Sequence, residues 1–170
     1  PVTFELGTGS GCIAITLAKR CPGIKLIASD VSKSAITLAK LNAETLDVIG
    51  QMDFREADGL TALPDYEQVN LIISNPPYIP SEDIADLQPE VRDFDPHLAL
   101  DGGGDGLRFH RLLAAEGQSH LKPGGKLMAE FGDGQESTIE DLFTQAAWPS
   151  VKIINDLAGR PRIVIASVAQ

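Results

Sequence analysis

Short apolar runs alternate along the chain with longer stretches whose apolar residues recur at helical spacing. The first run, Thr3–Leu6, leads into a cluster of glycines and then into 12–18, which reads as a buried helix. A second run over 25–29 ends at Asp30, and Ser32 is placed to cap a helix extending to about residue 46. This alternation predicts an α/β domain with a doubly wound, mostly parallel sheet. The other predicted strands are 52–56, 69–74, 126–131, 151–154 and 162–166, and the other predicted helices are 107–121 and 135–147.

Two connections in this pattern differ from the rest. The last two predicted strands are joined by 156–161, which is too short to contain a helix, so we expect them to form an antiparallel pair at the C-terminus. Residues 79–106 are instead rich in Pro, Asp and Gly, and they predict a long connection between regular elements. Connections of that length in compact domains are commonly lids or binding segments. We therefore expect 79–106 to take part in function.

A glycine-rich loop follows the first strand. Its sequence is Gly7-Thr8-Gly9-Ser10-Gly11, in which the third glycine comes one position too early for the fingerprint that binds dinucleotides. Glycines at this spacing let the backbone pass close under a ligand, and Asp30 at the end of the next strand is placed to accept from two ribose hydroxyls. With no phosphates to hold, the ligand predicted here is S-adenosylmethionine, with Asp58 or the turn at Gly59 beside its adenine. The alternative is that the glycines serve packing and Asp30 is a solvated strand end.

The strand over 69–74 ends in Asn75-Pro76-Pro77-Tyr78. Two prolines prevent further sheet pairing and hold the preceding residues extended, at the sheet edge where open α/β sheets bind ligands. The Asn75 side chain and the Pro76 carbonyl are hydrogen-bond acceptors, and Tyr78 adds a flat ring. This combination suits a planar NH₂ group. A plain strand-ending turn is the competing interpretation, since Asn-Pro commonly opens turns.

Composition narrows the class of protein. The chain has 170 residues with 43% hydrophobic content, enough for one domain over 1–170, and a net charge of −10 without a basic tract. An acidic surface disfavours direct binding of nucleic acid. Pro1 lies just before the first strand, so we expect an excised domain; no apolar stretch is long enough for a membrane span. The two cysteines, Cys12 and Cys21, flank a predicted helix, so we do not expect a disulfide framework; this favours a cytoplasmic protein. The three histidines lack the spacing of metal ligands, so we expect surface or capping roles and no metal site.

Taken together, these motifs resemble those of the class I S-adenosylmethionine-dependent methyltransferases, which have a Rossmann-like fold. More narrowly, the chain resembles the peptide chain release factor glutamine N5-methyltransferases, the HemK/PrmC family. The matches span nearly the whole chain and include segments outside the motifs described above. They are 5–11, Asp30, Asn42-Ala43, 74–79, 96–103, 105–107, Pro123-Gly124-Gly125 and 156–162.

The resemblance implies methylation of the glutamine of a Gly-Gly-Gln motif in a release factor, with S-adenosyl-L-homocysteine as the second product. Asn75, Pro76 and Tyr78 would be the catalytic residues, and Pro77 would join them in binding the substrate. The cofactor site would comprise Glu5, Gly7, Thr8, Gly9, Ser10, Gly11, Asp30, Asp58, Gly59 and Asn75. The implied partner is a release factor, with no membrane partner, and the implied state is a monomer.

Three residues depart from the family pattern. Glu5 stands where many class I enzymes have Asp, Asp95 stands where the family usually has Glu, and Gly59 stands near a position often aromatic. The family's N-terminal helical domain has no counterpart in the chain. Three alternatives stay open: an amino-methyltransferase acting on adenine or guanine in DNA or RNA, a non-catalytic cofactor-binding module and a nicotinamide oxidoreductase.

Overall fold

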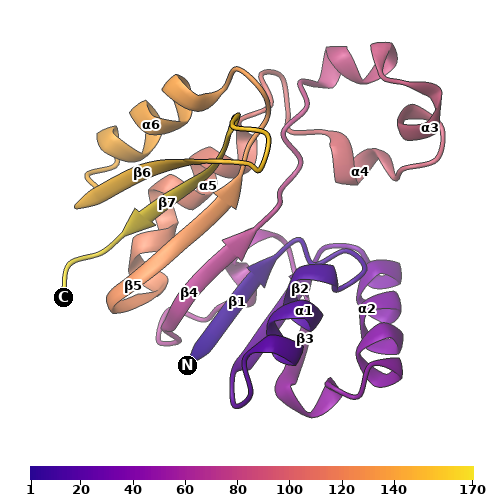
Figure 1. Ribbon diagram of the computed structural model, residues 1–170, viewed down its shortest axis with the longest axis vertical. Coiled ribbons are helices and arrows are strands. Elements are labelled where there is room, and N and C mark those ends of the chain that lie inside the picture. The colour runs from indigo at the N-terminus through magenta and orange to yellow at the C-terminus, as the bar shows by residue number, and fades with distance from the viewer.

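A computed structural model describes residues 1–170 and contains one seven-stranded sheet with helices on both faces (Figure 1). The strand order is β3-β2-β1-β4-β5-β7-β6. The first five strands run parallel, and β7 lies antiparallel between β5 and β6. The strands are β1 (Val2–Leu6), β2 (Lys25–Asp30), β3 (Met52–Glu56), β4 (Val69–Ser74), β5 (Leu121–Glu130), β6 (Ser150–Asn155) and β7 (Pro161–Ser167).

The α-helices connect the strands and cover the sheet. They are α1 (Cys12–Arg20), α2 (Lys33–Thr45), α3 (Pro89–Arg92), α4 (His97–Leu100), α5 (Arg108–Glu116) and α6 (Glu136–Gln145). Ser32 caps α2 as predicted, because its side chain accepts a hydrogen bond from the Ala35 N–H. None of the helices has the length and apolar character needed to cross a membrane.

Two hydrophobic clusters fill the two sides of the sheet. The smaller cluster joins α1 and α2 to β2 through residues such as Ala14, Ala43 and Leu26. The larger cluster contains Phe4 and Leu6 of β1 together with residues of β4, β5, β7, α5 and α6. Since successive strand residues point to opposite faces, Glu5 between Phe4 and Leu6 points toward the α1 side. Its carboxylate accepts a hydrogen bond from the backbone of Ala14 in α1.

The prediction of a doubly wound sheet with an antiparallel C-terminal pair is confirmed. The predicted helix over 107–121 is shorter, because α5 ends at Glu116 and a 3₁₀ turn follows over Gly117–His120. Strand β5 begins at Leu121 rather than at Lys126. The pairing jumps from Val69 with Leu121 to Leu71 with Lys126, so the Pro-Gly-Gly stretch forms a bulge within the strand instead of preceding it.

The connection 79–106 is more ordered than the sequence pattern indicates. It contains a 3₁₀ helix over Ser81–Asp86 followed by α3 and α4, and it projects beyond the end of β4 (Figure 1). We refer to residues 79–106 as the excursion. The histidine prediction was wrong for two of three residues: His110 and His120 are buried, and only His97 is exposed.

Candidate functional site

The two motifs found in the sequence meet at one edge of the sheet. Strand β1 pairs with β2 on one side and with β4 on the other, and the strand order reverses between β1 and β4. Leu6, the last residue of β1, is paired with Ser74, the last residue of β4. The glycine loop and the Asn75-Pro76-Pro77-Tyr78 segment therefore leave the sheet from adjacent positions. Crevices at such reversal points are the ligand sites of open α/β sheets.

The glycine loop has an open surface and a fixed path. Gly7 and Gly9 both have positive φ, at 73° and 54°, and a Cβ built on either would have no atom within 4 Å. Gly11 differs, because its Cβ would lie 2.8 Å from Ile15 Cδ1 and 3.2 Å from Ala39 Cβ. The first two glycines leave space for a ligand, and the third lets α1 and α2 approach each other.

Hydrogen bonds hold this loop against the neighbouring elements. The Thr8 N–H donates to the Ser29 carbonyl at 2.8 Å, and the Asn42 side chain of α2 donates to the Ser10 carbonyl at 2.9 Å. Asn42, one of the residues on which the family resemblance rests, thus ties α2 to the glycine loop. Ser10 itself is exposed beside the open glycines.

Asp30 lies at the junction of β2 with the glycine loop. One carboxylate oxygen accepts from the Gly9 N–H and the other accepts from the Ser32 N–H, each at 2.9 Å. Each oxygen of an ionised carboxylate has further acceptor capacity. Asp30 is therefore oriented by the backbone and can still accept from two hydroxyl groups.

Glu5 lies beneath the loop, with only 1% of its surface exposed. The Thr8 hydroxyl donates to its carboxylate at 2.5 Å. Burial raises the pKa of Glu5 from 4.5 to about 7, although the hydrogen bonds from Thr8 and Ala14 act in the opposite direction. The geometry shows Glu5 supporting the loop from below, and burial brings the pKa of its carboxyl close to neutral pH.

The turn after β3 lies next to Asp30, because the Ala57 N–H donates to the Asp30 carbonyl at 3.0 Å. Asp58 is exposed at this turn and precedes a 3₁₀ helix over Gly59–Ala62. A Cβ on Gly59 would lie 2.8 Å from Leu112 Cδ2 of α5. Leu112 thus occupies the space beside Gly59, near the position that is often aromatic in the family that the chain resembles.

A small cavity of about 120 Å³ is lined by the Asn75-Pro76-Pro77-Tyr78 segment, which we call the acceptor motif. Asn75 is exposed at this cavity, whereas Pro76 is buried. The opposite wall comes from the excursion, through Ala99 and Leu100. The excursion therefore forms part of this cavity.

Tyr78 is hydrogen-bonded to the last residue of β5 and to a residue shortly after it. Its hydroxyl donates to Glu130 Oε1 at 3.2 Å, and its carbonyl accepts from Gln135 Nε2 at 3.1 Å. Burial and the neighbouring Glu130 carboxylate raise the pKa of Tyr78 above its ordinary value, so the hydroxyl stays protonated. Since His110 Nε2 lies 2.8 Å from the Glu130 carbonyl, it acts as donor there. Sequence reasoning missed Glu130, Gln135 and His110, which lie far from the motif in the chain.

Glycines clustered around Tyr78 are the signal that could have found these partners. Gly102, Gly106 and Gly132 each approach Tyr78 so closely that a Cβ would lie 2.3 to 3.1 Å from one of its atoms. Such close approach marks a tightly packed segment.

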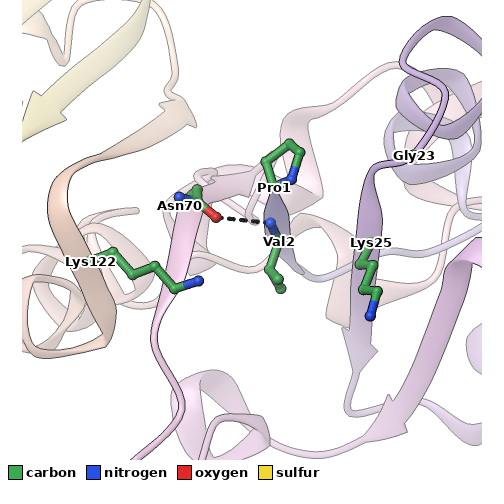
Figure 2. Close-up of a pocket in the computed structure, with 6 residues that line it drawn as sticks. All are labelled: Pro1, Val2, Gly23, Lys25, Asn70 and Lys122. Carbon is green, nitrogen blue, oxygen red and sulfur yellow. Dashed lines mark hydrogen bonds between the residues drawn. The ribbon is translucent and has the colours of Figure 1, made fainter.

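The larger pocket, about 480 Å³, lies at the opposite edge of the sheet, near the amino ends of β1, β2 and β4 (Figure 2). Its lining includes Lys25 and Lys122, and the Val2 N–H donates to Asn70 Oδ1 at 2.9 Å. No carboxylate lines it, so it lacks the group that would accept from ribose hydroxyls. No group of three or more His, Cys, Asp or Glu side chains is arranged to hold a metal ion.

The strand order, the glycine loop after β1 and the carboxylate at the end of β2 define a class I methyltransferase domain. Sequence comparison gives the same class. The chain belongs to the methyltransferase small domain family, whose model matches residues 2–88.

Curated relatives extend the similarity over nearly the whole chain. The release factor glutamine methyltransferase of Cereibacter sphaeroides is 44% identical over 163 residues, which cover 96% of this chain and 58% of the relative. That of Geobacter sulfurreducens is 41% identical over 161 residues, which cover 95% of this chain and 56% of the relative. The chain thus spans a little over half the length of these relatives.

Solved structures share the fold at lower sequence identity. A methyltransferase from Pyrococcus furiosus matches with a TM-score of 0.72 and 20% identity, covering 99% of this chain and 75% of the other. A ribosomal protein L11 methylase from Lactobacillus delbrueckii subsp. bulgaricus matches with a TM-score of 0.66 and 22% identity, covering 99% and 70%. These matches support the class I fold.

Proposed function

We propose that this chain is the catalytic domain of an enzyme that methylates N5 of a glutamine side chain in a peptide chain release factor. The observation that carries the proposal is the pairing of Leu6 with Ser74, which sets the glycine loop and the acceptor motif side by side. The names of the curated relatives support the choice of acceptor. The proposed setting is the cytoplasm, where release factors act.

The residues at the edge of the sheet fit S-adenosylmethionine. Gly7 and Gly9 leave open space above the loop, and Asp30 is oriented to accept from the ribose hydroxyls. In this proposal Ser10, Asp58, Gly59 and Asn75 also contact the cofactor, Gly11 fixes the path of the loop by packing against α2, and Glu5 and Thr8 support the loop from below. Bound there, the cofactor supplies an electrophilic methyl group.

The acceptor motif orients the amide nitrogen. In this proposal, the Asn75 side-chain oxygen and the Pro76 carbonyl each accept one N–H of the glutamine amide, and Pro77 and Tyr78 complete the wall of the cavity. An amide lone pair is delocalised into its carbonyl, so holding both N–H groups favours a nitrogen whose lone pair can attack. Positioning of this kind can contribute about 7–11 kcal/mol when the reacting atoms start in near-attack geometry.

The proposed methyl transfer does not require a general base. A nitrogen–methyl bond forms as the sulfur–methyl bond breaks, and the nitrogen then releases one proton to solvent. Glu130 is held by the Tyr78 hydroxyl and is therefore a support for the motif in this proposal rather than a base.

The charge of the excursion favours a protein acceptor. Residues 79–106 contain eight carboxylates and one arginine, a net charge of −7 within a chain whose total is −10. Phe94 and Leu98 in the same segment are 83% and 69% exposed. A negative wall beside the cavity repels a phosphate backbone, whereas it attracts a basic polypeptide. This distinguishes the proposed substrate from adenine or guanine in nucleic acid, whose amino-methyltransferases share the Asn-Pro-Pro-Tyr motif.

Mass spectrometry of a release factor, before and after incubation with the protein and the methyl donor, tests the proposal. We expect one added methyl on the glutamine of the Gly-Gly-Gln motif, and none when that glutamine is replaced by glutamate. A parallel reaction with labelled cofactor and total RNA or DNA serves as the comparison. Label in nucleic acid alone would overturn the proposal, and cofactor binding without transfer to any acceptor would indicate a non-catalytic binding module.

A further inference from the structure

Gln135 links the acceptor motif to the segment that follows β5. It is the residue immediately before α6, and it uses both ends of its side-chain amide. Nε2 donates to the Tyr78 carbonyl at 3.1 Å, while Oε1 accepts from the Gly132 N–H at 2.8 Å. The first contact spans 57 positions in the chain, whereas the second spans 3.

Only a primary amide satisfies both partners. The Tyr78 carbonyl requires a donor, and the Gly132 N–H requires an acceptor. Glutamate at this position could serve Gly132 but would bring a carboxylate against the Tyr78 carbonyl. Asparagine carries the same amide on a side chain shorter by one methylene, so it cannot span the same two partners from the same backbone position.

The surrounding backbone is shaped to fit this contact. A Cβ on Gly106 would lie 2.3 Å from the Tyr78 carbonyl oxygen and 2.8 Å from Gln135 Nε2, so it would clash with both bonded atoms. A Cβ on Gly132 would lie 3.0 Å from Gln135 Oε1 and 3.1 Å from Tyr78 Cδ2. Glycines at both positions therefore permit the Gln135 bridge, and Gly106 also has a positive φ of 75°.

The Gln135 bridge restrains the backbone that carries the two proposed acceptors of the substrate amide, the Pro76 carbonyl and the Asn75 side chain. Tyr78 is held at its carbonyl by Gln135 and at its hydroxyl by Glu130, so both ends of the residue are anchored to the end of β5. Pro76 and Pro77 have fixed φ values, so the backbone has few ways to relax between Asn75 and Tyr78. Displacement of the Tyr78 carbonyl is therefore transmitted to the Pro76 carbonyl.

We propose that Gln135 is a positioning residue for the methyl-transfer reaction, setting the place of the Pro76 carbonyl and the Asn75 side chain without touching substrate. This inference rests on the proposed function, because it concerns the same site. It predicts loss of turnover without loss of cofactor binding, since the cofactor loop and Asp30 are held by bonds that do not involve Gln135.

The test compares Gln135→Ala and Gln135→Glu with the parent and with Gln145→Ala, a control at an exposed glutamine at the other end of α6. Small misplacements of reacting groups can cost about 100-fold in rate. We expect kcat for the release factor to fall roughly 10- to 100-fold in both Gln135 variants. The cofactor Kd should stay near the parental value, the melting temperature should fall by only a few degrees because two hydrogen bonds are lost, and Gln145→Ala should match the parent throughout.

Three results would overturn the inference. The first is parental kcat in Gln135→Ala, and the second is parental kcat in Gln135→Glu, which keeps size but loses the donor. The third is a fall in kcat accompanied by a loss of cofactor affinity of the same fold-change, which would mean that Gln135 only supports the fold. Failure of the parent to methylate any release factor is a separate outcome that overturns the proposed function itself. In that case, hydrogen exchange at the Ile79 and Gly132 amides, expected to be faster in Gln135→Ala, still tests the bridge.

Discussion

Replacing the buried Glu5 by glutamine should change how the stability of the protein depends on pH. Burial gives Glu5 a higher pKa in the folded state than in the unfolded chain, rising from 4.5 to about 7. Between these pH values the folded state holds more protons than the unfolded state, so the stability falls as pH rises. Above about pH 7 both states are ionised and the cost of burying the charge is fully present.

The size of the effect follows from the two pKa values. Each tenfold change in proton affinity corresponds to about 1.4 kcal/mol. Raising the pKa of Glu5 from 4.5 to about 7 thus removes about 3 kcal/mol from the free energy of unfolding once the pH exceeds the higher value. Over the accessible window of about pH 5 to 8, the change attributable to Glu5 is about 2 to 3 kcal/mol.

Urea unfolding measures this contribution directly. Trp148, the only tryptophan, is 5% exposed and packs against Phe143, so its fluorescence reports loss of the core. The free energy of unfolding would be determined at several pH values for the parent, for Glu5→Gln and for Glu140→Gln, a control at an exposed position of α6.

We expect the difference in stability between Glu5→Gln and the parent to shift by about 2 to 3 kcal/mol in favour of glutamine as the pH rises from about 5 to 8. The control should follow the parent. Parallel curves for Glu5→Gln and the parent would refute the reasoning, because they would mean that Glu5 is ionised at the same pH in both states.

The remaining predictions concern the acceptor motif, the proposed cofactor site and the excursion. Asn75→Ala should lower kcat for release factor methylation by about 100-fold while the cofactor Kd, measured by calorimetry, changes little; parental turnover would contradict the assignment of the acceptor. Asp30→Asn should weaken cofactor binding by about 10- to 100-fold in the same calorimetric measurement, because a charge-assisted acceptor is lost, and unchanged affinity would show that the ribose binds elsewhere. Phe94→Ser should raise the KM for the release factor by about tenfold with little change in kcat, as expected for an exposed apolar contact with a protein substrate. Tyr66→Ser, which changes an aromatic side chain that is 89% exposed outside the excursion, is the steady-state kinetic control; equal effects of the two substitutions would argue against docking on the excursion.

The sequence predicts best those elements and motifs whose conformation depends only on residues close to one another in the chain. The predicted bounds of β3 and β4, Met52–Glu56 and Val69–Ser74, match the structure. The turn at the glycine loop could be predicted because its conformation depends on backbone freedom within five consecutive residues. The roles assigned to Asn75, Pro76 and Tyr78 remain predictions that the substitutions above can test.

Contacts between distant segments could not be read from these patterns. The Tyr78 hydroxyl meets Glu130 across 52 positions, and His110 is buried because Glu130 supplies its carbonyl partner. A polar residue in a helical pattern predicts an exposed side chain, and only the tertiary partner overrides that expectation. The short helices of the excursion were likewise missed, since pieces of four residues carry too few positions for a periodic signal.

The two ends of the excursion are fastened to each other. The Ile79 N–H donates to the Leu100 carbonyl at 3.1 Å, the Gly102 N–H donates to the Ile79 carbonyl at 2.9 Å, and the Ser81 N–H donates to the Gly103 carbonyl at 3.0 Å. A segment closed at its base in this way can change in length or sequence at small entropic cost to the rest of the domain. Residues between Ser81 and Ala99, whose side chains are mostly exposed, can therefore vary in length or sequence while the sheet and the glycine loop keep their conformation.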